Sequence, residues 1–432
     1  MQEKPHGYLK RECIICTELT QNTLQDLYTM QCTQPHMTVR VLPRVFSDIE
    51  EPKYVHCKIL ELQDVLFKNN AIPINGNLLS SLDNKRVLIT GAGGTLGSEL
   101  AIQLLHTNIS DVYLLGHGEY SIFLTVQRMK KFQSLGVGTQ IRCHPVLCEL
   151  LERNMVMRTI ADIRPDIIIH AAAYKHVDLV ESAPFIGLAS NVFATRFLLD
   201  AAHEASVSSF IFPSTDKACE PISIYGASKL ICEELLLCSQ YPRPNIIIVR
   251  FANILASRGS VISVFEEQIV ENSSVAITDA RCLRYFTHCS EIASSMLQLY
   301  QQYHAKRVQL FILVSEIKLR IDDFVAKIAA LHIKDTQKTI DIKELGLRAG
   351  EKLEEIICAE HEKKESTTLP SVFSITHDHT QNNITDINSL LKNLESVCFY
   401  DSSKPEQYRS LESLISYLNN HIPSFAMRKQ KL

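Results

Sequence analysis

Short apolar runs alternate with amphipathic stretches along the middle of the chain. The runs are rich in β-branched and aliphatic residues, as expected for buried strands; they are Arg86–Thr90, Asp111–Leu115, Ile141–Leu147, Asp166–His170, Phe210–Pro213 and Asn245–Arg250. Helical periodicity separates most of them, beginning with Ser98–Leu105. Because strands that alternate with helices form a parallel sheet covered on both faces, the pattern predicts an α/β fold with a doubly wound parallel sheet of the Rossmann type.

The pattern changes on either side of this region. Residues 81–262 are expected to form the Rossmann domain and to carry the catalytic residues. After Val261 the alternation becomes less regular, so residues 263–432 are assigned mainly to a smaller substrate-binding lobe and a C-terminal extension. Within them, the polar stretch Lys363–Thr368 is predicted to be a surface loop.

The first 80 residues read as a short α/β segment. Cys13–Leu19 and Val39–Leu42 are strand candidates, and Asn22–Cys32 is a helix candidate. This is too little chain to bury a core alone. We therefore expect residues 1–80 to pack on the main domain or to be the remnant of a larger unit.

Composition narrows the class of protein. The chain has 432 residues, a net charge of only −4 and 13 cysteines without a short-spaced framework. The charge argues against nucleic acid as a partner. No secretory signal opens the sequence and no apolar run approaches the ~20 residues of a membrane span, so we expect a cytoplasmic protein with free thiols.

The cysteines at the N-terminus have a spacing that resembles a zinc site. Cys13 and Cys16 are followed by Cys32 and His36. The two isoleucines between the first pair lie in an apolar run, which suits a buried strand better than a metal knuckle. No metal site is predicted.

A glycine-rich loop is the strongest local signal. Thr90–Gly97 reads TGAGGTLG, follows a predicted strand and opens a predicted helix. Glycines at 91, 94 and 97 allow a tight turn, a close approach to a pyrophosphate and close packing of the helix on the strand. The free N–H groups of the helix N-terminus would then face the phosphates. We expect Thr90, Gly91, Gly93, Gly94, Thr95, Leu96 and Gly97 to hold a dinucleotide.

The type of dinucleotide stays open. A carboxylate normally follows the second strand and binds the ribose of NAD. Here Leu115 is followed by Gly116 and His117, which leaves room for a 2′-phosphate and favours NADP. The lack of an adjacent arginine and the presence of Glu119 argue the other way.

Two polar groups follow the strand Phe210–Pro213. Tyr225 and Lys229 are spaced i, i+4, so they share one face of a helix, where the lysine can lower the pKa of the phenol. Asp216 and Lys217 are an adjacent acid and base that could expel a hydroxyl and abstract a proton. The alternative for this pair is a capping aspartate beside a solvated lysine.

Seven segments resemble the CapD-like polysaccharide-biosynthesis dehydratases, within the extended short-chain dehydrogenases/reductases. They run in order from about Leu82 to Glu355 and are TGAGGTLGSE (90–99), LLGHGEYSIF (114–123), HAAAYKHVDLVE (170–181), STDKACEPISIYGASK (214–229), VRFANILASRGSVI (249–262), RYF (284–286) and GLRAGEKLEE (346–355). The resemblance implies NAD(P)-dependent 4,6-dehydration of a UDP-N-acetylhexosamine, with UDP-N-acetylglucosamine the expected substrate and a homo-oligomer the expected assembly.

The resemblance also implies a role for each catalytic residue. Tyr225 and Lys229 would help oxidise carbon 4 of the sugar, while Thr215 would hydrogen-bond the carbon-4 hydroxyl. Lys217 would remove the carbon-5 proton, and Asp216 would protonate the departing carbon-6 hydroxyl. The hydride would then return to carbon 6, so the cofactor would stay bound.

Binding residues follow from the same resemblance. The expected contacts of the substrate are Asn253, Arg258, Val261, Arg284 and Glu351, and further contacts of the dinucleotide are His117, Glu149, Ala171, Ala172, Ala173 and Lys175. Arginine suits a diphosphate because its planar fork binds two oxygens at once.

The chain also departs from the family pattern. Alanine stands at 194 and 252 where glycine is usual, and Asp178, Ser263 and Ala349 stand where proline is usual. A Cβ at a position of positive φ would crowd the backbone. Two alternatives therefore stay open, namely a nucleotide-sugar 4-epimerase or reductase, and a non-catalytic scaffold that binds a cofactor. The N-terminal segment resembles the end of a longer architecture with membrane helices, so we expect a truncated or split version.

Overall fold

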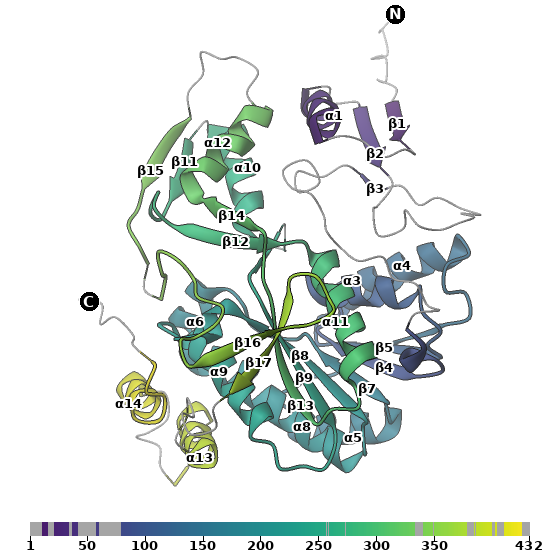
Figure 1. Cartoon of the computed structure of the whole chain (residues 1–432), viewed down its shortest axis with the longest axis vertical. Coiled ribbons are helices and arrows are strands. Elements are labelled where there is room, and N and C mark those ends of the chain that lie inside the picture. The colour runs from purple at the N-terminus through teal and green to yellow at the C-terminus, as the bar shows by residue number, and fades with distance from the viewer. Residues whose placement is uncertain are drawn as a thin grey trace, which may run out of the picture.

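The computed structural model describes most of the chain. The described residues are 11–15, 21–33, 37–41, 58–59 and 79–425, the last range without 256, 258, 273, 333–339, 349, 378–383, 385, 400–401 and 404–409. Figure 1 shows a large sheet surrounded by helices, with a smaller lobe above it that carries the N-terminal elements.

The large sheet has nine strands in the order β16-β17-β13-β9-β8-β7-β4-β5-β6. Seven run parallel, namely β4 (Arg86–Thr90), β5 (Asp111–Gly116), β6 (Arg142–Leu147), β7 (Ile167–His170), β8 (Ser209–Thr215), β9 (Asn245–Phe251) and β13 (Val308–Leu313). From β4 the chain continues through β5 to β6 on one side of the sheet, and from β7 it continues through β8 and β9 on the other side. The topological switch point therefore lies between β4 and β7. Ligands bind at such a point in doubly wound sheets. The predicted fold class is confirmed.

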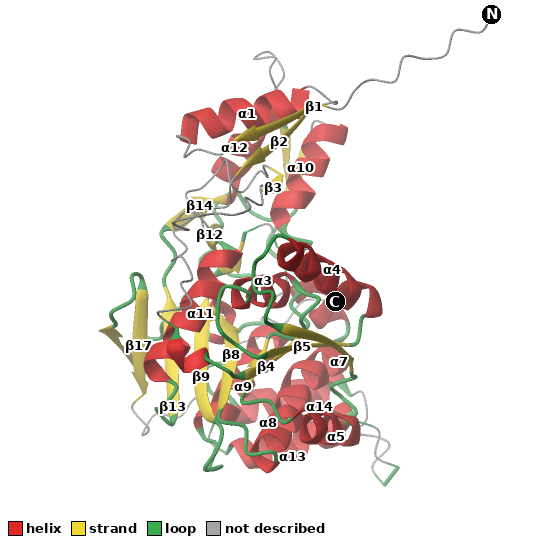
Figure 2. Ribbon diagram, turned by 90° about the vertical axis from the view of Figure 1, so that its right-hand side faces the viewer, coloured by secondary structure: helices red, strands yellow, loops and turns green. Residues whose placement is uncertain are grey.

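Helices cover both faces of this sheet (Figures 1 and 2). One apolar cluster includes residues of η3 (Ser80–Leu82), α3 (Thr95–Leu104), α4 (Glu119–Ser134) and α11 (Cys289–Tyr303). The other includes residues of α5 (Arg153–Ile163), α8 (Ala194–Glu204) and α9 (Ile224–Leu237), together with the C-terminal helices α13 (Ile387–Cys398) and α14 (Leu411–His421). The C-terminal extension is thus part of the core of the Rossmann domain.

One helix of the core has an unusually apolar composition. Pro184–Glu204 is long and apolar enough to cross a membrane, but 72% of its apolar window is buried inside the fold. It comprises α7 (Pro184–Leu188), a π-helical segment η4 (Ala189–Phe193) and α8. Its apolar character is explained by packing against α5 and α9.

The smaller lobe has its own apolar core. It contains α10 (Val261–Asn272) and α12 (Ile321–His332), a sheet of β10 (Asn253–Ile254), β12 (Leu283–Thr287) and β14 (Ile317–Arg320), and the parallel pair β11 (Ser274–Ile277) and β15 (Asp341–Glu344). The lobe is built from segments on both sides of α11, so its chain leaves the large sheet after β9 and returns to it.

The N-terminal segment packs on this lobe rather than on the large sheet (Figures 1 and 2). It consists of β1 (Arg11–Ile15), α1 (Gln21–Thr33), β2 (Met37–Val41) and β3 (Lys58–Ile59). Leu24, Tyr28 and Val39 share a core with Phe265 and Phe324. Cys13 lies in β1 and Cys32 in α1, whereas Cys16 and His36 are outside the described residues.

Two predictions about the C-terminal part need correction. The large sheet does not stop at residue 262, because β13, β17 (Val372–His377) and β16 (Glu362–Ser366) all join it. The loop expected at Lys363–Thr368 is wrong over most of its length, since Lys363–Ser366 belong to β16. Among the described strands, β16 pairs with β17 alone and is an edge strand, where exposed charged side chains are common and prevent further pairing.

Candidate active site

The glycine loop after β4 is built so that no side chain could replace its key glycines. Gly91 has a φ of +64°, and a Cβ there would lie 2.7 Å from Ala172 Cα. A Cβ on Gly97 would lie 2.3 Å from the carbonyl oxygen of Gly91. The loop therefore turns tightly, passes close to the strand β7 and lets α3 begin against it, as a phosphate cradle requires.

A pocket opens beside this loop at the switch point between β4 and β7. Of the predicted cofactor residues, its lining includes Gly91, Gly93, Gly94, His117, Glu149, Ala171, Ala172 and Ala173. It also includes residues that were not predicted as cofactor contacts, namely Gly116, Gly118, Ser121, Cys148, Leu150, Leu151, Tyr174, Ser190 and Ala194. A cradle of glycines at a helix N-terminus fits the pyrophosphate of a dinucleotide, so the residues present fit an NAD(P) cofactor.

Four other predicted cofactor residues are not part of the pocket lining, and their contacts are with the surrounding protein. Thr90 is buried and its Oγ1 lies 2.7 Å from His170 Nδ1. Thr95 and Leu96 begin α3, and Leu96 belongs to the core. Lys175 donates a hydrogen bond to Ser257 Oγ at 3.1 Å. Burial lowers the pKa of His170 to about 3, so this imidazole is neutral.

A buried amide connects the pocket to the catalytic helix. Asn191, in the π-helical segment η4, accepts a hydrogen bond from Tyr174 N at 2.8 Å and donates one to Tyr174 O at 3.1 Å. Its Nδ2 also donates to Ser228 Oγ on α9 at 2.9 Å. Asn191 could not be found from the sequence, because an amide in an apolar helical stretch carries no motif. π-helical segments are frequent at functional sites, since they re-aim a side chain.

Tyr225 and Lys229 lie on α9 as the spacing predicted. Ser223 caps the helix by accepting a hydrogen bond from Gly226 N at 3.0 Å. Glu181, at the end of α6 (Val177–Ser182), accepts a second from Ile224 N at 2.7 Å. Both caps satisfy backbone N–H groups that a helix N-terminus leaves free, so they fix the position of Tyr225.

The electrostatics of this pair differ from the expectation. Burial raises the pKa of Tyr225 to about 12, and the cation that opposes this shift is Lys217 rather than Lys229. Lys229 donates a hydrogen bond to Pro213 O at 2.9 Å and lies 3.9 Å from the ring centroid of Phe212. Burial lowers its pKa to about 8. Lys229 therefore ties α9 to the end of β8.

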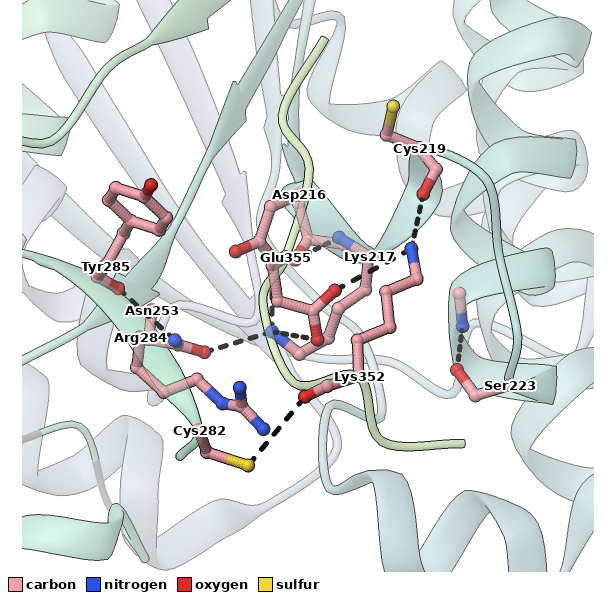
Figure 3. Close-up of polar contacts among 12 residues, drawn as sticks. Asp216, Lys217, Cys219, Ser223, Asn253, Cys282, Arg284, Tyr285, Lys352 and Glu355 are labelled. Carbon is pink, nitrogen blue, oxygen red and sulfur yellow. Dashed lines mark hydrogen bonds and ion pairs between the residues drawn. The ribbon is translucent and has the colours of Figure 1, made fainter. Parts of the chain in front are cut away.

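Asp216 and Lys217 form a close pair directly after β8, in the short turn η5 (Asp216–Ala218). Lys217 Nζ lies 3.1 Å from Asp216 Oδ1 and donates to Asn253 Oδ1 at 3.0 Å. Thr215 Oγ1 donates to Asp216 Oδ1 at 2.9 Å. Asp216 is 1% exposed, and the Lys217 side chain is 18% exposed and bonded to Asp216 and Asn253, which argues against the alternative of a capping aspartate beside a solvated lysine (Figure 3).

Two further charged residues complete this cluster and were missed by the sequence analysis. Glu355 Oε1 lies 3.9 Å from Lys217 Nζ, and Glu355 Oε2 lies 3.8 Å from Lys352 Nζ. Lys352 also donates to Cys219 O at 2.9 Å. Figure 3 shows both residues reaching the Asp216–Lys217 pair from a separate segment of the chain. They lie within the GLRAGEKLEE motif, which was the available signal.

Of the expected substrate residues, Asn253 contacts the Asp216–Lys217 pair directly, whereas the others lie elsewhere or are not described. Asn253 contacts Lys217 and also donates to Tyr285 O at 3.2 Å. Arg284, on β12, lies on the same side of the site and donates to Leu353 O at 3.2 Å. Glu351 Oε2 accepts from Arg348 N, and Val261 begins α10 at the edge of the small lobe. Arg258 is outside the described residues.

The departures from the family pattern do not strain the backbone where it is described. Ala194 has a φ of −60°, and Ala252 is not among the residues with positive φ. The expectation that these alanines crowd the backbone through positive φ is therefore wrong. Asp178 pairs with Arg348 at the surface, and Ser263 lies in the first turn of α10. Ala349 is outside the described residues.

The fold and the site place the chain in a known family. Residues 87–377 match the family model described as "Polysaccharide biosynthesis protein", and the chain belongs to this family. The capsular polysaccharide biosynthesis protein CapD of Staphylococcus aureus is 30% identical over 375 residues, which cover 86% of this chain and 61% of CapD. The alignment with the probable protein EpsC of Bacillus subtilis covers 59% of EpsC, so the chain spans about three fifths of these relatives.

Other relatives carry the names of enzymes. A UDP-N-acetylglucosamine 4,6-dehydratase (inverting) of Campylobacter jejuni is 26% identical over 303 residues, covering 68% of this chain and 83% of that protein. A UDP-glucose 4-epimerase of Rickettsia massiliae is 27% identical over 301 residues, covering 68% and 84%. The sequence resemblance is thus shared with both classes of enzyme.

Solved structures confirm the architecture. The X-ray structure of Pen from Bacillus thuringiensis superposes with a TM-score of 0.60 at 28% identity, covering 70% of this chain and 89% of that one. The dTDP-glucose 4,6-dehydratase DesIV from Streptomyces venezuelae, solved with NAD bound, superposes with a TM-score of 0.54 at 18% identity over 63% of this chain and 88% of that one. The fold is that of the extended short-chain dehydrogenases/reductases.

Proposed function

We propose that this chain is an NAD(P)-dependent 4,6-dehydratase of a UDP-N-acetylhexosamine, with UDP-N-acetylglucosamine as its substrate. The product is a 4-keto-6-deoxy sugar nucleotide for the synthesis of a surface polysaccharide. The observation that carries the proposal is the ion pair between buried Asp216 and partly buried Lys217, which follows β8 in η5, a turn that contacts the helix of Tyr225. The similarity to the 4,6-dehydratase of Campylobacter jejuni also supports the proposal.

The first step needs a base for the carbon-4 hydroxyl. A bound nicotinamide would supply the acceptor for the carbon-4 hydride and later return it to carbon 6. Tyr225 receives the hydroxyl proton, and the Lys217 ammonium favours the phenolate by opposing the effect of burial. Thr215, already bonded to Asp216, is placed to orient the same hydroxyl.

The elimination needs an acid and a base, and the Asp216–Lys217 pair can provide both. Neighbouring carboxylates raise the pKa of Lys217 in spite of its burial, so the resting residue is an ammonium. Transfer of one proton from Lys217 to Asp216 across 3.1 Å gives a neutral amine and a carboxylic acid. The amine then takes the carbon-5 proton while the acid protonates the carbon-6 hydroxyl, which leaves as water. The elimination returns both groups to their starting states. Return of the hydride to carbon 6 would require a proton at carbon 5, which the Lys217 ammonium supplies. The proton that Tyr225 took from the carbon-4 hydroxyl then restores Lys217, so no external acid or base is consumed over the cycle.

The cofactor preference forms a second part of the proposal. In the described part of the pocket, β5 ends at Gly116 and is followed by His117 and Gly118, so none of these three positions offers a carboxylate to a ribose 2′-hydroxyl, although Glu149 lines the same pocket. This arrangement favours NADP over NAD.

All cysteines that the structure describes are free thiols, in keeping with a reducing cytoplasm as the compartment.

A 4-epimerase is the second candidate because epimerases occur among the relatives. That reaction uses the glycine loop, Tyr225 and Lys229 but does not need an acid–base pair at Asp216 and Lys217. A non-catalytic scaffold would hold the dinucleotide and convert nothing.

Purified protein and UDP-N-acetylglucosamine, without added cofactor, test these alternatives. We expect a 4-keto-6-deoxy product, seen by mass spectrometry as the loss of one water. Asp216→Asn and Lys217→Met should each abolish it while the absorbance of the bound dinucleotide is retained. A carbon-4 epimer that both variants still form would identify an epimerase. Retained dinucleotide with no conversion would identify a scaffold.

A further inference from the structure

Glu355 is a buried carboxylate with unusually loose contacts. It is 6% exposed, yet its two ion pairs, with Lys217 and Lys352, have N···O distances of 3.9 Å and 3.8 Å. Among the described residues, its Oε2 has no hydrogen-bond partner, and neither has Oδ2 of Asp216. Two buried carboxylates therefore share two ammonium groups without full hydrogen bonding (Figure 3). Such unsatisfied groups are rare in folded proteins, and a catalytic role is one explanation for them.

A second buried ionic cluster in the same protein shows what a structural arrangement looks like. Arg250 is bound by both oxygens of Glu233, at 3.1 Å and 2.6 Å, and by both oxygens of Glu362, at 2.9 Å and 3.1 Å. Every charge there is held by direct hydrogen bonds. Glu355 has no such bond to Lys217, so at 3.9 Å it stabilises the ammonium through its charge and does not fix it by a hydrogen bond.

We propose that Glu355 is a positioning residue for the acid–base pair, which holds the Lys217 ammonium in the site and keeps it charged until the sugar is bound. This role rests on the proposed dehydration. Glu355 comes from the segment between β15 and β16, whereas Lys217 follows β8, so the charge state of Lys217 depends on the docking of that segment. Lys352 balances the second oxygen of Glu355 and so prevents Glu355 from binding Lys217 more tightly.

The groups that face Lys217 come from four parts of the fold. Asp216 approaches from η5, Tyr225 from α9, Asn253 from β10 and Glu355 from the β15–β16 segment. Removing the carboxylate of Glu355 leaves Asp216 as the single carboxylate among these groups. Lys217 would then lose its proton at a lower pH, because one of two stabilising negative charges is gone.

Competitive labelling measures this effect without relying on turnover. Trace acetic anhydride reacts only with a neutral amine, and the Lys217 side chain is 18% exposed, so a small reagent can reach it. Acetylation of the Lys217 peptide would be followed by mass spectrometry from pH 7 to 11 in the full chain, in Glu355→Gln and in Glu355→Asp. The matched control is Glu354→Gln, since Glu354 is an adjacent, exposed carboxylate bound to Lys318 and Tyr285.

We expect Glu355→Gln to lower the pH of half-maximal labelling of Lys217 by about one unit or more. Glu355→Asp, with its carboxylate drawn back, should give a smaller shift in the same direction, and Glu354→Gln none. If Glu355→Gln does not fold, as judged by its circular dichroism spectrum, the test rests on Glu355→Asp, whose labelling midpoint should still move to lower pH. Labelling unchanged in the folded Glu355 variants, or equally changed in Glu354→Gln, would overturn the inference.

The alkaline limb of the pH dependence of kcat/KM should move to lower pH in Glu355→Gln by the same amount as the labelling curve. Absence of any 4-keto product from the wild-type chain would refute the proposed dehydration alone, because the labelling experiment still reports on Glu355.

Discussion

Glu181 Oε1 accepts a hydrogen bond from Ile224 N at 2.7 Å and thereby fastens α6 to the N-terminus of the catalytic helix α9. The same oxygen lies 3.3 Å from Tyr225 N. Glu181→Ala should lower the free energy of unfolding by about 1–2 kcal/mol, as loss of a helix cap does, and should reduce kcat more than it raises KM. Denaturant unfolding and steady-state kinetics measure both effects. Asp162→Asn, at an exposed carboxylate on α5, should change neither.

The glycine loop gives a prediction with a built-in comparison. Gly91→Ala and Gly346→Ala both place a Cβ at a positive φ, of +64° and +86°. Only the first meets backbone, at 2.7 Å, whereas nothing lies within 4 Å of the second. Gly346→Ala should lose about 1 kcal/mol of stability through φ strain, whereas Gly91→Ala should lose more, because the backbone must also shift, and should lose the bound dinucleotide. Absorbance of the purified proteins tests this, and a dinucleotide retained by Gly91→Ala would contradict the cradle.

Lys229 predicts a pH dependence of stability. Its pKa of about 8 in the folded chain lies below the ordinary lysine value of 10.5, because burial disfavours the ammonium. Between these pH values the unfolded chain binds more protons, so the contribution of Lys229 to the free energy of unfolding rises as pH rises. The difference in unfolding free energy between the wild type and Lys229→Met should therefore grow in favour of the wild type from pH 8 to 10.5. A difference that stays flat would contradict the buried, depressed lysine.

The Arg250 cluster predicts a large loss of stability. Arg250 is 1% exposed and bridges Glu233 on α9 to Glu362 on β16. Arg250→Met leaves two buried carboxylates uncompensated and should cost about 3–5 kcal/mol in denaturant unfolding. The exposed pair Arg158 and Asp162 is the control, because Arg158→Met should cost less than about 0.5 kcal/mol. A small loss at Arg250 would mean that solvent reaches the cluster.

The parts of the fold that follow local patterns were predictable. The six strand candidates from Arg86 to Arg250 are all strands, because buried parallel strands are continuous apolar runs. β16 was not predictable, since the charged residues of an edge strand resemble those of a loop. The joining of β13 to β9 depends on tertiary pairing across the small lobe, which no local pattern encodes.

The candidate site shows the same division. The motif spacings placed Tyr225, Lys229, Asp216 and Lys217, and the structure brings Lys217 and Tyr225 close enough to interact. Glu181, Asn191 and Glu355 act through contacts with residues more than thirty positions away in sequence, so their importance emerges only in the folded chain.

The proposed dehydration is tested most directly by running the reaction in heavy water and locating deuterium by mass spectrometry of the sugar product. Abstraction of the carbon-5 proton by Lys217 and its replacement from solvent predict one deuterium at carbon 5 of a product that has lost one water. A converted sugar without solvent deuterium at carbon 5 would contradict the account.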